Sequence, residues 1–182
     1  NRSEVRFFFP AGDHSKYDKN PSWKNEEYRH LVSRISGKFE AGLHQSYYSA
    51  DNLPLIIDEL ARLKTMTGKE IKSGRFHYIR MFTPVSYRNL SAAGITEDYS
   101  MGFHDEPGFR AGIARPYFFY DVSEEKQTNL KIISFQVMDA TLYKYKKLDP
   151  VASKERIFKL IDETRKAGGR FVSLWHNTPL LE

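Results

Sequence analysis

A pattern that occurs four times constrains the fold more than any other feature of this sequence. Each copy has apolar residues at helical spacing, then one or two glycines, then a run rich in β-forming residues. The expected helices carry these faces: Tyr28, Leu31, Val32 and Ile35; Leu53, Ile56, Ile57, Leu60 and Leu63; Tyr87 and Leu90; Ile157, Leu160, Ile161 and Thr164. Alternating helices and strands are typical of βαβ units, so we predict an α/β fold with a mostly parallel sheet.

Residues that start and end helices frame these segments. The expected starts are Asn20-Pro21-Ser22, Asp51-Asn52, Thr83-Pro84 and Asp149-Pro150, and the expected left-handed stops are Gly37, Gly68, Gly94 and Gly168-Gly169. Strands are predicted over residues 5–9, 38–44, 71–81, 95–101, 114–120, 132–137 and 170–175. A barrel and an open doubly wound sheet both fit this order. The 182 residues suffice for one continuous core, so residues 1–182 are predicted to form a single domain, with the stretch 102–138 as an insertion or an irregular part of it.

Composition narrows the kinds of site that the chain can build. The absence of cysteine excludes disulfides, thiolate metal sites and a cysteine nucleophile, so a metal would be held by His, Asp or Glu. No apolar run approaches the roughly 18–20 residues that span a bilayer, and the charged start is no signal peptide, so a cytoplasmic location is the default expectation. The net charge of +5 is scattered over the expected helices, and no glycine-rich phosphate loop occurs. We therefore expect no nucleic-acid partner.

Polar side chains gather where the expected strands end. In parallel α/β folds the ligand site lies beyond the carboxyl ends of the strands. The residues at these ends are Asp13-His14, His44, Arg75 with His77, Asp98, and His176. Histidines and carboxylates without cysteine suit a hydrolytic metal site or general acid–base catalysis. Tyrosines also fall in loops or at strand ends (Tyr47, Tyr48, Tyr78, Tyr99 and Tyr117), where they either line a sugar-binding cleft or are simply half-buried.

The motifs, in this order, resemble those of the polysaccharide deacetylases, metal-dependent carbohydrate esterases with a distorted (β/α)7 barrel. RFFFPAG at residues 6–12 is similar to the strand after the family's first motif, and GLHQS at 42–46 lies where the family has a histidine pair at spacing i, i+4. Asp58-Glu59-Leu60 and Thr67-Gly68 follow in family order, and Leu174-Trp175-His176 resembles the Leu-x-His motif. GLHQSYYS, GRFHYIRM, DYSMGF and GFRAGIARPYFFYD are similar to longer deacetylases of a Bacteroidetes type.

The resemblance implies roles for individual residues. His44 is the implied metal ligand, and His176 is the implied general acid that protonates the departing amine. The family's second metal histidine falls at Tyr48, and its usual Ser or Thr falls at Gln45. The Arg-x-Pro-Tyr motif matches Arg75 with His77 by chain order, or Arg115-Pro116-Tyr117 by spelling, and both assignments stay open. The implied substrate-binding set is Arg75, His77, Asp98, Arg110, Arg115 and Tyr117, although Asp98 also suits a second-shell partner or a turn carboxylate.

The family's first motif, an Asp-Asp pair that supplies a base and a metal carboxylate, has no counterpart ahead of RFFFPAG. We therefore expect a barrel incomplete at its N-terminus, because the natural protein begins earlier or because this branch lacks that chemistry. The implied function is removal of N-acetyl groups from a sugar or polysaccharide with a divalent metal, zinc in the first place. This chain alone should bind metal weakly and hydrolyse little. The alternative is an inactive glycan-binding or scaffold domain; a phosphate-binding or nucleic-acid-binding domain would need a strongly salt-dependent affinity.

Overall fold

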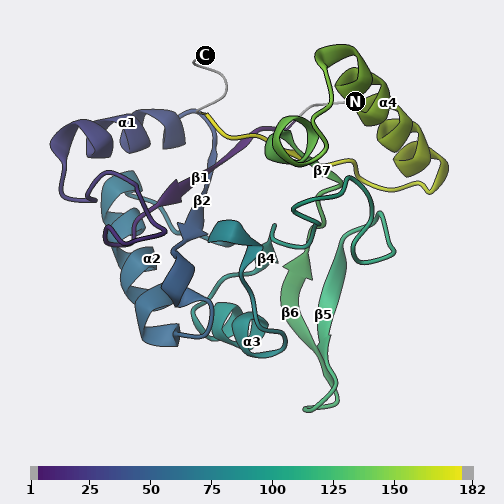
Figure 1. The fold of residues 1–182 in the computed structure, drawn as a ribbon. Helices are drawn as coiled ribbons and strands as arrows, with labels where there is room; N and C mark the ends of the chain where they lie inside the picture. Colours follow the sequence, from purple (N-terminus) through teal and green to yellow (C-terminus); the bar gives the residue numbers. More distant parts are fainter. Residues whose placement is uncertain (1–3, 178–182) are drawn as a thin grey trace. The chain divides into compact units, whose positions relative to one another are not determined.

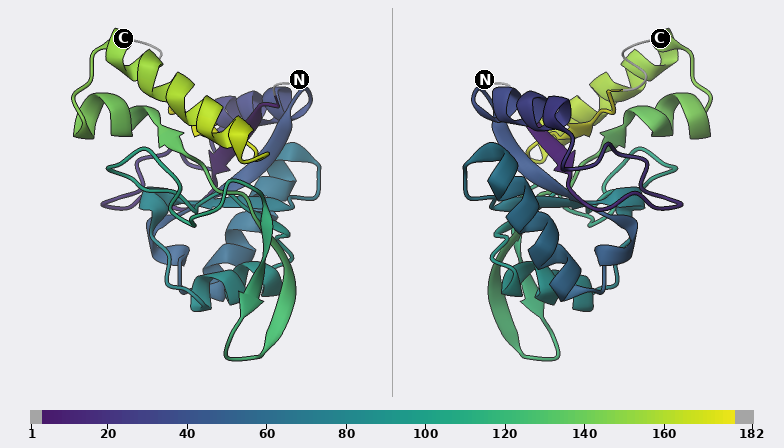
Figure 2. Two further views of the ribbon diagram at one scale, coloured as in Figure 1. Left: turned by 90° about the vertical axis from the view of Figure 1, so that its right-hand side faces the viewer. Right: turned by 90° about the vertical axis from the view of Figure 1, so that its left-hand side faces the viewer.

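Four parallel strands form the centre of the chain's main sheet in the computed structural model, which describes residues 4–177. They are β1 (Arg6–Pro10), β2 (Glu40–Gln45), β3 (Ser73–Phe76) and β4 (Glu97–Asp98), each paired with the next. Strands β5 (Tyr117–Asp121) and β6 (Lys126–Ile132) extend this sheet in the order β1-β2-β3-β4-β6-β5. Figures 1 and 2 show β5 and β6 side by side, joined by a short turn.

Two units divide the described residues. The first unit contains the chain up to Asp98 together with Phe118–Lys131, and the second unit contains Tyr99–Tyr117 and the chain from Ile132 onward. The predicted mixed α/β class is confirmed, and the six-stranded sheet is consistent with part of a deacetylase-type barrel. Among residues 4–177 the strands do not form a closed seven-stranded barrel, because β7 (Val137–Met138) and β8 (Ser173–Leu174) pair only with each other.

The helices of the first unit begin and end at residues with clear local reasons. Helix α1 (Glu26–Ser36) begins at Asn25, whose side chain accepts a hydrogen bond from the backbone of Tyr28, and not at the predicted Asn20-Pro21-Ser22. Helix α2 (Leu53–Thr67) begins at Asn52 and ends at Gly68, as predicted. Helix α3 (Val85–Ala92) follows Pro84, and a short 3₁₀ turn η1 (Tyr47–Ser49) follows β2.

One of the four predicted left-handed stops is wrong. Gly37 has φ −64°, a right-handed conformation, whereas Gly68, Gly94 and Gly168 have φ between 60° and 84°. Of the four predicted stops, three therefore exploit the freedom of glycine at positive φ.

Strands are shorter than the sequence pattern predicts. Strand β3 ends at Phe76, because the next residues form a 3₁₀ turn, η2 (His77–Ile79), in which Tyr78 and Ile79 have φ of 57° and 55°. The predicted strand at 95–101 shrinks to Glu97–Asp98, and the one at 132–137 falls between β6 and β7. Apolar runs without strict alternation therefore predict where strands lie but not where they end.

The core of the first unit lies between its parallel strands and the helices α1 and α2. Phe9, Val32, Leu43 and Leu63 are buried in one cluster with Met66. Burial of each such side chain stabilises the fold by about 1.5–3 kcal/mol. In Figure 1 α1 and α2 lie beside β1 and β2, whose carboxyl ends are thereby fixed in position.

Gln45, the last residue of β2, is fully buried, and neither polar atom of its carboxamide has a hydrogen-bond partner. An unsatisfied buried amide costs about 1–3 kcal/mol. Replacement by methionine, which has a similar length and no such groups, is expected to raise the free energy of unfolding by about 1 kcal/mol, measured by urea denaturation. A variant less stable than the wild type would show that this carboxamide is satisfied in solution.

The second unit is built around a short parallel pair and one long helix. Strand β7 (Val137–Met138) pairs with β8 (Ser173–Leu174), and Met138 lies opposite Leu174. Helix α4 (Pro150–Lys166) begins at Asp149, as predicted, and a π-helical turn, η3 (Thr141–Tyr145), precedes it. The core of the second unit consists of Val137, Leu142 and Leu160, packed against Phe109, Leu148, Ile157 and Phe171. No helix within residues 4–177 combines the length and apolarity that crossing a membrane requires.

Candidate functional site

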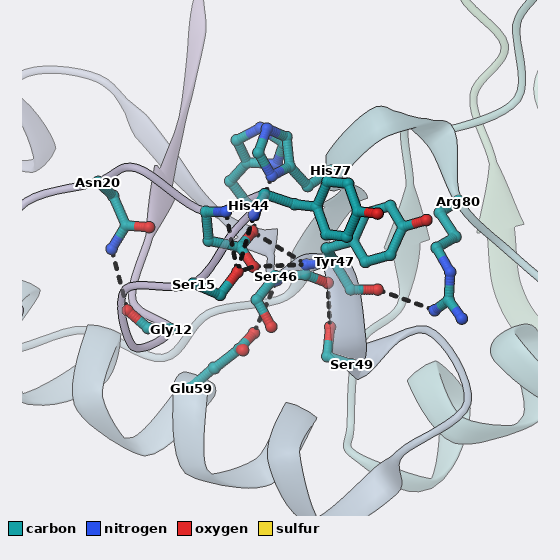
Figure 3. Close-up of polar contacts among 12 residues, drawn as sticks. Gly12, Ser15, Asn20, His44, Ser46, Tyr47, Ser49, Glu59, His77 and Arg80 are labelled. Atoms are coloured by element: carbon teal, nitrogen blue, oxygen red, sulfur yellow. Dashed lines mark hydrogen bonds and ion pairs between the residues drawn. The ribbon is translucent and has the colours of Figure 1, made fainter.

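The register of the parallel sheet brings three predicted site residues together in the first unit. His44 of β2 lies directly opposite Arg75 of β3, and His77 is the first residue after β3 ends. The imidazole rings of His44 and His77 have centroids 4.8 Å apart and meet edge to face (Figure 3). Neighbouring strand ends thus gather these side chains at one edge of the sheet, as expected for a parallel α/β fold.

Both ring nitrogens of His44 have partners. Its Nδ1 lies 2.9 Å from the backbone carbonyl oxygen of Arg75, and its Nε2 lies 2.8 Å from Nη2 of the same residue. A carbonyl only accepts and a guanidinium only donates, so the hydrogen of the neutral ring is assigned to Nδ1 and the lone pair to Nε2. Arg75 therefore fixes the tautomer of His44 from both sides.

His77 is held by a carboxylate that the sequence did not single out. Its Nδ1 lies 2.8 Å from Oδ1 of Asp18, a residue only 3% exposed. Asp18 also accepts hydrogen bonds from the backbone N–H of Tyr47 and the hydroxyl of Ser15. A carboxylate acceptor places the hydrogen of the neutral His77 ring on Nδ1 and leaves Nε2 with the lone pair. Asp18 lies in a loop without periodicity, so only its place after β1 hinted at a role.

Tyrosines from three segments form an aromatic cluster that reaches His77 through Tyr78. Tyr17 stacks on Tyr47 with centroids 3.9 Å apart, and Tyr78 lies 4.5 Å from the His77 ring. Tyr78 is 63% exposed and has the left-handed backbone conformation that side chains rarely adopt. Arg80 donates to the backbone carbonyl of Tyr47 and lies over its ring (Figure 3). Tyr17, Tyr47 and Tyr78 therefore form one aromatic cluster, which brings together two of the tyrosines noted in the sequence.

Glu59 of α2 lies fully buried beneath the loop that follows β2. Its Oε2 accepts a hydrogen bond from the backbone N–H of Ser46 at 3.1 Å, whereas its Oε1 has no partner (Figure 3). A Cβ added at Gly12 would lie 2.9 Å from Oε1, so this glycine makes room for the carboxyl group. Burial raises the pKa of Glu59 to about 7, against the hydrogen bond from Ser46.

In the second unit the parallel register joins Asp139 to His176. Asp139 follows β7, and its Oδ1 lies 2.7 Å from Nδ1 of His176, while its Oδ2 accepts the backbone N–H of His176 at 2.7 Å. Burial alone would raise the pKa of Asp139, but the hydrogen bonds from His176 and Ala140 outweigh it and hold this pKa below its ordinary value. No hydrogen bond to Nε2 of His176 is made by the residues that the structure describes.

An apolar hollow of about 370 Å³ adjoins this pair within the second unit. The residues that line it include Asp139, Leu142, Lys154, Ile157 and the half-exposed Trp175. This volume falls in the range of small-molecule sites. The hollow therefore places aromatic and apolar surface beside a histidine whose Nδ1 is held by a carboxylate.

The other predicted site residues lie in different surroundings. Asp98, at the end of β4, is fully buried, and Tyr48 of η1 is half-exposed beside Tyr47. Arg110 donates to the carbonyl of Gly102, and Arg115 to that of Gly168, both in the second unit; Tyr117 begins β5. Of the two counterparts for the Arg-x-Pro-Tyr motif, the structure brings the one with Arg75 to His44.

The donor set of the first unit fits part of a metal site. Both imidazoles have Nδ1 bound to an oxygen acceptor, as metal-binding histidines do, but Nε2 of His44 already accepts a hydrogen bond from Arg75. Across residues 4–177, however, no three His, Asp or Glu side chains are grouped so that they would hold a metal ion. His44 is the metal ligand that the resemblance implies, and His77 is the imidazole that lies beside it.

Comparison with solved structures supports a deacetylase-type fold. A candidate polysaccharide deacetylase from Mycobacterium smegmatis superposes with a TM-score of 0.64 at 16% identity, over 94% of this chain. The chain spans 57% of the length of that neighbour. A GH57 branching enzyme from Thermococcus kodakaraensis also superposes, with a TM-score of 0.47 and 11% identity. The match covers 85% of this chain and 42% of the branching enzyme, and it carries no argument about the fold. No family model and no curated protein matches the sequence.

Proposed function

We propose that this chain is the core of a polysaccharide deacetylase-like hydrolase that removes N-acetyl groups from a sugar or polysaccharide. The observation that carries the proposal is the Asp139–His176 pair, in which a buried carboxylate holds Nδ1 of an imidazole at 2.7 Å. On a fold similar to that of a candidate deacetylase, this is the arrangement of a histidine that transfers protons. The His176 side chain is half-exposed, so a substrate can reach its Nε2 and receive a proton from it.

Deacetylation breaks the amide C–N bond and adds the elements of water. The oxygen of water bonds to the acetyl carbon, the proton that water loses passes to a carboxylate base of the kind that the family's first motif supplies, and the sugar nitrogen gains a proton as the C–N bond breaks. His176 is the residue that supplies this proton, from Nε2 of its imidazolium form. Asp139 stabilises that positive charge, because its lowered pKa keeps the carboxylate ionised. Zinc, when bound, would polarise the acetyl carbonyl and acidify water.

The tyrosines around His77 support a carbohydrate as the substrate. Sugars present C–H faces that pack on aromatic rings, and tyrosine adds a hydroxyl that forms hydrogen bonds. Tyr78 and Tyr48 are both at least half exposed; Tyr78 lies beside His77, and Tyr48 lies beside Tyr17 and Tyr47. An exposed aromatic side chain held in a left-handed conformation is a form of backbone strain that clusters at binding sites.

Acetate release from N-acetylated chitooligosaccharides tests this function. The full-length product of the gene that encodes this chain is expected to release acetate when zinc is added. The His44→Ala variant is expected to lose release at least about tenfold, whereas His30→Ala, which removes an exposed histidine from α1, should leave it unchanged. Equal release by the wild type and His44→Ala would disprove the role of His44.

A second function is favoured by one observation. The second family histidine is replaced by Tyr48, and no three-ligand group occurs in the described residues, so a glycan-binding domain without catalysis fits the same fold. This alternative predicts that the full-length protein binds chitooligosaccharides in a calorimeter and releases no acetate at any zinc concentration. Acetate release above the uncatalysed rate would rule it out.

A further inference from the structure

We infer that the apolar hollow of the second unit is a binding site for a small aromatic carboxylic acid. This is the hollow of about 370 Å³ that Leu142, Ile157 and Trp175 line. Among the described residues that line it, neither His176 nor Leu174 occurs. The ligand is therefore a separate molecule from the acetyl group of the proposed reaction, and the inference does not depend on that reaction.

The size and the walls of the hollow are the first argument. Leu142 comes from η3, Ile157 from α4, and Trp175 follows β8. Leu142 is nearly buried, whereas Trp175 is 54% exposed, so an aromatic wall that solvent reaches stands over an apolar floor. The volume suits a single small molecule. A ring is the favoured body of the ligand, because it can pack on the indole in an offset or edge-to-face arrangement.

Polar groups along the lining are the second argument. Tyr143, Ser153 and Lys154 contribute two hydroxyl groups and one ammonium group. Within residues 4–177 none of these three groups forms a hydrogen bond or an ion pair, and the ammonium group of Lys154 lies 5.6 Å from the ring centroid of Phe158. An apolar pocket with a few polar groups that can orient a ligand is the usual composition of a small-molecule site.

The charges around the hollow favour an anionic ligand. Lys154 and Asp139 are its charged lining residues in the described part of the chain. Asp139 is already engaged, because one oxygen is bonded to the ring of His176 and the other to its backbone N–H. Asp149, at the start of α4, accepts a hydrogen bond from the backbone N–H of Ala152. Neither carboxylate pairs with Lys154, so its charge is available to the carboxylate of a ligand.

Calorimetric titration of the full-length protein with 3-phenylpropionate tests the site. Two related compounds are the comparisons: 3-phenylpropanamide keeps the shape without the charge, and propionate keeps the carboxylate without the ring. We expect 3-phenylpropionate to bind at one site. The amide should bind about twofold to fivefold more weakly, since an exposed ion pair contributes little. Propionate should bind at least about tenfold more weakly, since it buries no ring. Equal affinities for the three compounds would overturn the inference.

Variants separate the two contacts of the ligand. Lys154→Met should lower the affinity for 3-phenylpropionate about twofold to fivefold and leave that for the amide unchanged. Trp175→Ala should lower both affinities at least about tenfold. Lys159→Met, which removes an exposed charge from the same helix, and Tyr120→Ala, which removes a 53% exposed ring from β5, are the matched controls and should change neither affinity. A Lys154→Met variant that still prefers the acid to the amide would contradict the assigned ion pair.

A second measurement covers a Trp175→Ala variant that fails to fold. The wild type is labelled with 5-fluorotryptophan, and the ¹⁹F resonance of Trp175 is identified by its absence from Trp175→Phe. 3-Phenylpropionate should shift this resonance, and propionate at the same concentration should not. The resonance of Trp23, which packs on the core of the first unit, should stay in place. A ligand that shifts Trp23 alone would overturn the inference, and so would a full-length protein that binds no 3-phenylpropionate.

Discussion

Replacement of His176 by alanine is expected to lower acetate release by the full-length protein about 10²- to 10⁴-fold and to leave the fold intact. This range is the usual contribution of a positioned general acid or base. The side chain is 39% exposed and its contact is one carboxylate, so little packing is lost. The measurement is kcat for an N-acetylated oligosaccharide, together with the melting temperature of the same sample.

Two variants serve as comparisons for this result. Asp139→Asn keeps the shape of the carboxylate but removes its charge. Like His176→Ala, it should therefore lower kcat, while KM changes little. His104→Ala removes a more exposed histidine of the second unit, which lies near Asp105, and should leave kcat unchanged. A fall in melting temperature without a fall in kcat would show that His176 has a packing role only.

The second large effect expected is on stability and concerns Glu59. Its pKa is about 7 in the folded protein because of burial, against an ordinary value of 4.5. Below pH 4.5 both states hold the proton, and the contribution of Glu59 to stability is fully present. As pH rises from 4.5 to 7 the unfolded state loses the proton first, so the free energy of unfolding falls, by about 3 kcal/mol in total. Above pH 7 the loss is complete.

The Glu59→Gln variant should remove this loss, since glutamine keeps an acceptor for the backbone N–H of Ser46 and carries no proton to lose. Urea denaturation at several pH values should show equal stability of variant and wild type at pH 4, and a more stable variant by about 3 kcal/mol at pH 8. Asp58→Asn, the exposed neighbour on the same helix, is the matched control. Parallel curves for wild type and Glu59→Gln would mean that Glu59 is solvated in solution.

Local signals predicted the helices and the order of the elements. Asn52 and Gly68 bound α2, and Asp149 begins α4, because caps act through residues a few positions away. Strand ends were predicted less well. The 3₁₀ turn at His77–Ile79 follows β3 directly, and nothing in an apolar run such as 71–81 indicates that Tyr78 adopts positive φ.

By itself, the sequence determined the α/β class, the presence of parallel strands, and the positions of His44, Arg75, His77 and His176 at or near strand ends. Only the tertiary structure decided their partners. Asp18 and His77 are bonded to each other although they lie 59 residues apart in the sequence, and Asp139 and His176 although they lie 37 residues apart. Such pairings depend on strand register and loop paths, which the packing of the whole chain sets, whereas periodicity and caps report only on neighbours in sequence.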